Sequence, residues 1–171
     1  SCSLVGSEMC IRDRDGDRIY AVVKGVGTSS DGKALGLLAP RPEGEILALQ
    51  RAYEKSGIAP ESIGLIEAHG TGIPLGDRTE IHSLTQVFGS RQHLPHCALG
   101  SVKSMIGHCL PAAGAASLIK TVLALYHKVL PPTLCEQVNS DLEIEQTPFY
   151  LNTEARPWIC LLYTSDAADD P

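Results

Sequence analysis

The sequence predicts a domain of the α/β class, and three observations lead to this prediction. Short apolar runs alternate with longer amphipathic segments along most of the chain, as expected where strands alternate with helices. Two of the short runs are followed by glycine-rich turns, which are typical of strand-to-helix connections. The chain is also long enough, at 171 residues, and apolar enough, at 43% hydrophobic residues, to bury one core and to exclude wholesale disorder.

The two ends of the chain do not follow this pattern. Residues 1–14 (SCSLVGSEMCIRDR) show neither a helical nor a strand period, and they look like translated sequencing-adapter read-through, as does the stretch from about Leu161 (LLYTSDAADDP). The alternative is that both are real tails. We expect residues 1–14 and 161–171 to be non-native flanks and residues 15–160 to form the domain.

The first part of the domain is expected to contain a strand, a long loop and a helix. Residues 18–24 (RIYAVVK) are β-branched and apolar and predict a strand. Residues 25–42 are rich in glycine and serine and predict a long loop, either solvated or functional. Residues 43–56 place apolar side chains at helical spacing behind an acidic first turn, and Gly57 is a stop signal, so this segment predicts an amphipathic helix.

Two further strand-and-helix units follow. Residues 64–68 and 97–102 predict strands. After the first of them, Asp77 and Glu80 have the spacing of a capping box, which predicts the start of a helix. We prefer this capping role for the two carboxylates to a catalytic one. The apolar residues that continue the helix are Ile81, Leu84, Val87 and Phe88.

Residues 111–128 predict the most apolar helix of the chain, which Pro131 and Pro132 end. Apolar side chains occur on nearly all sides of this helix, whereas a chain of this size has little room to surround a helix completely. The pattern therefore predicts that another half of the fold or a dimer partner covers it. Residues 149–151 (FYL) predict a last short strand.

Composition and charge exclude several classes of function. The formal net charge is -6, from 14 basic and 20 acidic residues, and no basic cluster occurs, so nucleic acid is not an expected partner. Lys120, His127 and Lys128 interrupt the longest apolar window, which favours a buried helix over a membrane span, and no signal peptide is recognisable. The six cysteines lack C-x-x-C spacing, so we expect free thiols, no metal site and a cytoplasmic location. They are Cys2, Cys10, Cys97, Cys109, Cys135 and Cys160.

The candidate site consists of two histidines and a lysine in the glycine-rich turns. The first turn lies in IEAHGTGIPLGDRTE and contains His69, and the second lies in GSVKSMIGH and contains Lys103 and His108. Each turn follows a short buried strand, so both imidazoles are expected at the same end of one sheet, where they can meet in one pocket. The alternative for the second turn is a helix-entry loop with a packed histidine and a solvated lysine.

Together the two turns resemble motifs of the beta-ketoacyl synthase family of condensing enzymes, in which the corresponding stretches are close to EAHGTGT and GSVKSNIGH. The resemblance extends from about Ile19 to Trp158, and the closing EARPW is similar to that of synthase domains in modular type I polyketide synthases. It implies the C-terminal half of a thiolase-like layered αβαβα fold, which is built from two similar halves. The alternative is an unrelated α/β binding domain whose motifs match by chance.

The resemblance implies an acyltransferase that joins an acyl group on a cysteine to a malonyl-type unit on a carrier protein, with loss of carbon dioxide, in polyketide or fatty-acid biosynthesis. It assigns His69 and His108 to polarising the malonyl thioester carbonyl, because the enolate that forms there needs hydrogen-bond donors. Lys103 would orient His108, and Thr71 would bind the pantetheine arm of the carrier. No cofactor is expected to bind directly, because the substrates are carried on phosphopantetheine.

The nucleophile of the family lies in its N-terminal half, in a setting like DTACSS, and none of the six cysteines here has that setting. Cys109 adjoins His108, but the family has no nucleophile at that place. We therefore expect a truncated domain that is inactive alone. It would need the N-terminal half and an acyl carrier protein, and it would form a homodimer in the intact enzyme. The alternative is a non-catalytic partner subunit of the chain-length-factor type.

Two positions depart from the motifs of the family. Ile73 stands where HGTGT has its second threonine, and Met105 stands where KSNIGH has asparagine. The first change removes a hydroxyl and the second removes an amide, which would make the site drier and could alter substrate choice. Because both histidines and Lys103 are retained, we do not interpret these changes as a loss of function.

Overall fold

The computed structural model describes residues 14–30, 32, 41–90 and 94–159. Its centre is a parallel sheet of three strands in the order β1-β2-β4. Strand β1 (Leu65–Glu67) pairs with β2 (Cys97–Gly100), and β2 pairs with β4 (Phe149–Leu151). Because the strands are parallel, their carboxyl ends lie at the same edge of the sheet, and the glycine-rich turns begin there.

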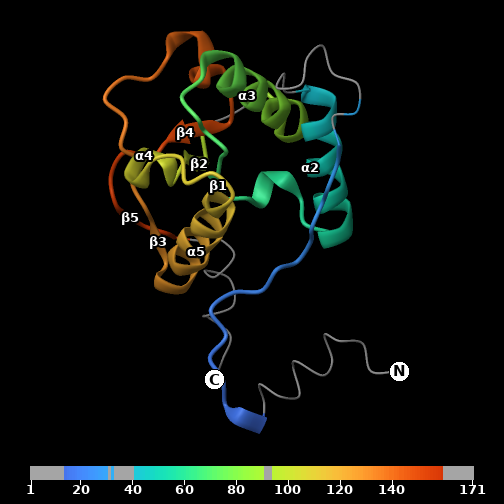
Figure 1. The fold of residues 1–171 in the computed structure, drawn as a ribbon, viewed down its shortest axis with the longest axis vertical. Helices are drawn as coiled ribbons and strands as arrows, with labels where there is room; N and C mark the ends of the chain where they lie inside the picture. Colours follow the sequence, from blue (N-terminus) through green and yellow to red (C-terminus); the bar gives the residue numbers. More distant parts are fainter. Residues whose placement is uncertain (1–13, 31, 33–40, 91–93, 160–171) are drawn as a thin grey trace.

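Helices cover both faces of this sheet, as Figure 1 shows. Helices α2 (Pro42–Ser56) and α3 (Pro74–Phe88) pack together on one side of the strands, and α5 (Ala112–His127) lies on the other. The apolar core lies between the sheet and α3. Its buried members are Ile81, Leu84, Phe88, Cys97, Leu99 and Phe149. The predicted α/β class is therefore confirmed.

Short elements connect these layers. The turn of 3₁₀ helix η1 (Pro60–Ser62) precedes β1, and the short helix α4 (Lys103–Ile106) leads from β2 towards α5. After α5, strand β3 (Val129–Leu130) pairs antiparallel with β5 (Arg156–Pro157). The remaining elements are η2 (Ser140–Leu142) and η3 (Ile144–Gln146).

Helix α2 begins and ends as its sequence predicts. Pro42 occupies the first helical position, where its missing N–H leaves no hydrogen bond unmade. Gly57 ends the helix in the left-handed region, with φ 66° and ψ 16°, and its N–H donates to the carbonyl of Tyr53. The helices predicted around residues 81–88 and 111–128 and the strand predicted at 149–151 are also present.

The strand predicted for residues 18–24 is wrong. This segment is irregular, and Ile19, Val22 and Val23 are exposed. A strand needs a neighbour that completes its backbone hydrogen bonds, and β-branched composition supplies only a preference for the extended form. No strand within the described part of the chain pairs with these residues. The residues that follow this segment are bound to α2, because Arg51 and Lys55 donate to the carbonyls of residues 28 and 26.

The predicted capping box is also wrong. Helix α3 begins at Pro74, with Ile73 at the cap position, and no side chain caps it. Proline presets the helical backbone angle, so the helix starts three residues before Asp77. Asp77 and Glu80 therefore lie inside α3, where their side chains can reach the preceding turn. The strand predicted for residues 97–102 is shorter than expected, because it ends at Gly100.

One side of α5 lacks cover among the described residues. Leu118 and Ile119 are 56% and 59% exposed, and Leu123 and Leu125 are exposed as well. Lys120, by contrast, reaches inward to the sheet. Helix α5 thus carries apolar side chains on nearly all sides, as the sequence shows, and the described residues bury only some of them.

The predicted flanks at residues 1–14 and 161–171 lie outside the described residues, apart from Arg14, as do Cys2, Cys10 and Cys160. Most of the loop predicted for residues 25–42 lies outside them too, at residues 31 and 33–40.

Candidate functional site

His69 follows β1, His108 follows α4, and their two imidazole rings lie against each other. The ring centroids are 5.8 Å apart and the planes are nearly perpendicular, at 88°. Both residues are exposed. The two turns lie at the same edge of the sheet, as predicted, because neighbouring parallel strands end there. The rings are in contact with each other, but they line different cavities, His69 the first described below and His108 the second.

Hydrogen bonding at each Nδ1 atom determines what the rings present to a ligand. The backbone N–H of Leu110 donates to Nδ1 of His108 at 3.0 Å. Nδ1 of His69 lies 3.3 Å from Nζ of Lys103, an ammonium group that can only donate. A neutral imidazole that accepts at Nδ1 carries its proton at Nε2. Each ring therefore offers one Nε2–H donor.

Lys103 binds the loop of the first histidine. Its ammonium group donates to the backbone carbonyl of His69 in addition to its contact with the ring. The expectation that Lys103 orients His108 is thus not met, because among the described residues the hydrogen bonds of its side chain go to His69. The reason is its position: Lys103 begins α4 beside the loop that follows β1, whereas His108 lies beyond the end of α4.

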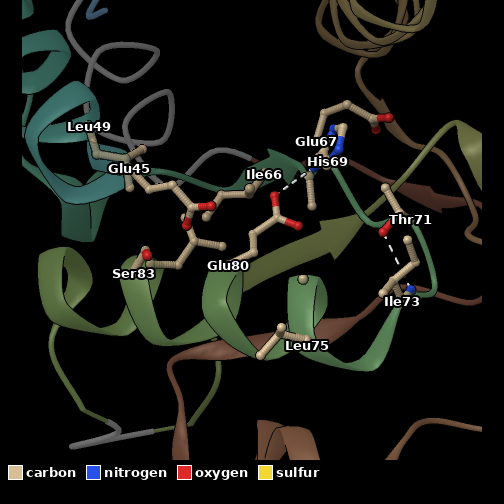
Figure 2. A pocket seen from close by; sticks show the side chains of 13 residues that line it. Glu45, Leu49, Ile66, Glu67, His69, Thr71, Ile73, Leu75, Glu80 and Ser83 are labelled. Atoms are coloured by element: carbon tan, nitrogen blue, oxygen red, sulfur yellow. Dashed lines mark hydrogen bonds between the residues drawn. The ribbon is translucent and has the colours of Figure 1, made fainter. Parts of the chain in front are cut away.

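Two carboxylates from α3 hold the loop that contains His69. Glu80 accepts the backbone N–H groups of His69 and Gly70, at 2.6 and 2.9 Å, and Figure 2 shows it reaching from α3 to that loop. Asp77 accepts those of Thr71 and of the glycine that follows it, at 3.1 and 3.3 Å. Four consecutive N–H groups are thus held by two acidic side chains. This role was not predicted from the sequence, although two carboxylates three residues apart directly after a glycine-rich loop are a signal for it.

The glycines of this loop are required by its conformation. Gly70 has φ of 43°, and a Cβ atom there would lie 2.8 Å from Cβ of Ser101. Ser101, which is buried after β2, donates weakly to the carbonyls of His69 and Gly70 at 3.4 Å. The absence of a side chain at Gly70 therefore lets the two histidine loops approach each other.

Thr71 lies between two cavities, each of about 530 Å³. Figure 2 shows residues that line the first, among them His69 beside Glu67 and Thr71 beside Ile73. The second contains Lys103 and His108. Further residues that line the first cavity are Leu49, Ile66, Ile73, Leu75 and Leu84, and further residues that line the second are Asp77, Ser104, Thr133, Leu134 and Cys135.

The two positions that depart from the family motifs are both exposed, and Met105 lines neither cavity. Ile73 is 60% exposed at the rim of the first cavity, and Met105 is exposed on α4. Cys109 is exposed, and its thiol contacts the carbonyls of Ile106 and Gly107. Neither contact is with a cation or an imidazole. Such a partner is what would favour a nucleophilic thiolate.

The described residues hold no metal centre. In the ranges 14–30, 32, 41–90 and 94–159, no group of three or more His, Cys, Asp or Glu side chains is arranged to bind a metal ion. The same part of the chain contains no helix that combines the length and the apolar character needed to cross a bilayer.

Cys97 should resist alkylation in the native domain, because burial raises the pKa of its thiol from 9.0 to about 12. We expect iodoacetamide to leave Cys97 unmodified until denaturant is added, as judged by mass spectrometry of tryptic peptides. The raised pKa also means that the neutral thiol contributes its full stability below about pH 9 and that this contribution is lost as the pH rises towards 12. Native labelling of Cys97 as fast as the exposed Cys135 would contradict the burial.

Replacement of Glu80 by alanine should destabilise the domain by about 1.5–3 kcal/mol, because two N–H groups lose a charged acceptor. Denaturant unfolding of the intact domain measures this change. Glu61→Ala is the matched control, since Glu61 is exposed on η1. Equal unfolding free energies for the two variants would show that Glu80 does not hold the loop.

Known proteins resemble this chain both in sequence and in structure. Residues 20–136 match the family described as beta-ketoacyl synthase, C-terminal domain. The chain is 43% identical over 159 residues to the polyketide synthase PksM of Bacillus subtilis, covering 92% of this chain and 4% of that protein. It is 42% identical over 153 residues to a polyunsaturated fatty acid synthase of Thraustochytrium, covering 85% of this chain and 5% of that protein.

Solved ketosynthase structures share the fold. The ketosynthase from module 6 of the bacillaene synthase of Bacillus subtilis superposes with a TM-score of 0.83 at 40% identity, over 93% of this chain and 28% of that one. The oxazolomycin ketosynthase of Streptomyces albus superposes with a TM-score of 0.81 at 38% identity, over 88% of this chain and 26% of that one. This chain thus spans less than a third of each. It belongs to the beta-ketoacyl synthase family, as a C-terminal domain related to the ketosynthase modules of type I polyketide synthases.

Proposed function

We propose that the intact protein is a ketosynthase that performs a decarboxylative Claisen condensation. The substrates would be an acyl thioester on an enzyme cysteine and a malonyl-type thioester on the phosphopantetheine of an acyl carrier protein. The observation that carries this proposal is the pair of Nε2–H donors on imidazoles whose centroids are 5.8 Å apart. Family membership supports the reaction class, and the relatives are named as polyketide and polyunsaturated fatty acid synthases.

The chemistry places a defined demand on those donors. The bond between the α-carbon and the carboxylate carbon of the malonyl unit breaks, carbon dioxide leaves, and the electron pair moves towards the thioester oxygen. His69 and His108 would donate to this oxygen as its negative charge develops. The α-carbon then attacks the acyl thioester, and the C–S bond to the cysteine breaks, which releases the thiolate.

Lys103 and Thr71 would support this step in different ways. Because the ammonium of Lys103 engages Nδ1 and the carbonyl of His69, we assign it to positioning and to fixing the tautomer of that ring. The hydroxyl oxygen of Thr71 accepts the N–H of Ile73 at 3.4 Å, so its own proton can be donated. Its place between the two cavities suits a donor to an amide of the pantetheine arm.

The remainder of the domain would complete the fold and the site. The N-terminal half, with the nucleophilic cysteine, would cover the exposed apolar side of α5, where Leu118 and Ile119 lie. The intact enzyme would be a cytoplasmic homodimer, a location that suits the free thiols of Cys97, Cys109 and Cys135. The present chain alone would be inactive, since it has two of the three catalytic groups.

The test is to recover the upstream reading frame, express the intact domain and supply it with an acyl thioester and a malonyl-loaded carrier protein. Mass spectrometry should detect an acylated cysteine and then a β-ketoacyl carrier, with one carbon dioxide released for each condensation. An upstream half without a cysteine at the nucleophile position, and no acyl-enzyme, would overturn the proposal and favour a non-catalytic partner subunit.

A further inference from the structure

A buried ion pair lies beneath the two histidine loops, on the α5 side of the sheet. Nζ of Lys120, on α5, is 2.7 Å from Oε2 of Glu67, the last residue of β1. Their side chains are only 10% and 6% exposed. Figure 2 shows Glu67 beside His69 and directed away from Glu80 and α3, so it is separate from the carboxylates that hold the loop from the other side.

The second oxygen of Glu67 connects the two loops. Its Oε1 accepts the backbone N–H of Val102, and it also receives the hydroxyl of Ser117 at 3.4 Å. Val102 is buried and directly precedes Lys103, whose ammonium binds His69. Glu67 itself lies two residues before His69. One carboxylate is thus close in sequence to the first histidine and bonded to the backbone that positions the lysine.

Stability alone is a weak reason for this pair. Removing two charges from water is costly, and well-packed apolar residues of the same size often replace a buried ion pair without loss of stability. The N–H of Val102, however, needs an acceptor because it is buried, and an apolar replacement cannot provide one. The ammonium group of Lys120, 2.7 Å from Oε2 of Glu67, holds this acceptor in place beneath the loops.

We infer that Glu67 and Lys120 are positioning residues for the condensation, and this inference rests on the proposed function. Glu67 fixes the backbone at Val102. This fixes the position of Lys103, the first residue of α4, and hence the contact of its ammonium group with His69. Lys120 compensates the buried charge of Glu67. The pair acts through Lys103 and does not touch the reacting atoms.

Two double variants of the intact ketosynthase separate the acceptor from the charge. E67Q/K120M removes both charges and keeps an oxygen for the N–H of Val102, whereas E67M/K120M removes the oxygen as well. We expect E67M/K120M to show kcat about 100-fold below that of E67Q/K120M with equal KM, because a small displacement of a catalytic group has an effect of this size. Its melting temperature should be a few degrees lower, because the buried N–H of Val102 loses its acceptor. E154Q/R156Q, which removes an exposed pair with 4.0 Å separation, should match the parent.

Several outcomes would overturn the inference. Equal kcat for the two double variants, whether both match the parent or both are impaired, would show that the acceptor at position 67 does not position the site. If E67M/K120M fails to fold, E67N/K120M replaces it, because asparagine keeps a polar amide but is one methylene too short to reach Val102.

Crystal structures of the same variants distinguish this inference from the proposed function. The distance from Nζ of Lys103 to Nδ1 of His69, 3.3 Å here, should be retained in E67Q/K120M and lost in E67M/K120M. Retention in both would overturn the inference even if the parent condenses its substrates. A parent that fails to condense would refute the proposed function, and the distances would still decide the positioning role.

Discussion

Replacement of His108 by alanine in the intact ketosynthase should lower kcat for condensation by about 100- to 1,000-fold, which is the usual effect of removing one donor from an oxyanion site. The backbone N–H of Leu110 donates to Nδ1 of His108, so the variant loses the Nε2–H of a ring that lines the same cavity as Lys103. Steady-state assays with a malonyl-loaded carrier, read by carbon dioxide release, measure the change. Acylation of the cysteine should continue, because His108 acts on the second thioester.

His82→Ala is the control for this prediction, since His82 is an exposed histidine on α3 that lines neither cavity. It should retain the activity of the parent. Loss of acylation in His108→Ala would mean that the residue serves the first half-reaction instead. A rate within threefold of the parent would show that His108 is not an oxyanion donor.

The sequence predicts the arrangement of the fold well where the signal is local. Apolar periodicity locates α2 and α5, and Gly57 marks an end because only a residue tolerant of positive φ suits that position. The segment at residues 18–24 shows the limit of this reasoning. Its composition favours an extended chain, but a strand forms only where another strand completes the ladder, and no local pattern contains that information.

The site could be predicted in position but not in its contacts. His69 and His108 come together because the turns that contain them begin at the ends of neighbouring parallel strands, which is a property of the topology. Which histidine Lys103 contacts depends on the direction in which α4 leaves the sheet. The roles of Asp77 and Glu80 depend on whether α3 starts at Pro74 or later. Glu67 and Lys120 are 53 positions apart, so nothing in the sequence pairs them.

Replacement of Phe149 by alanine should reduce the free energy of unfolding by about 3–5 kcal/mol, the cost of a large cavity in a core that cannot collapse around it. Phe149 is 1% exposed on β4, and its ring meets that of Phe88 at 5.2 Å, so its loss also removes an aromatic contact between the sheet and α3. Denaturant unfolding of the intact domain provides the measurement. Leu94→Ala, at a residue 81% exposed, should change stability by less than about 0.5 kcal/mol. Because α3 also supplies the two carboxylates that hold the His69 loop, the Phe149 variant should lose condensation activity at a lower denaturant concentration than the control. A loss of unfolding free energy smaller than that of Leu94→Ala would show that the contact between α3 and the sheet does not support the fold.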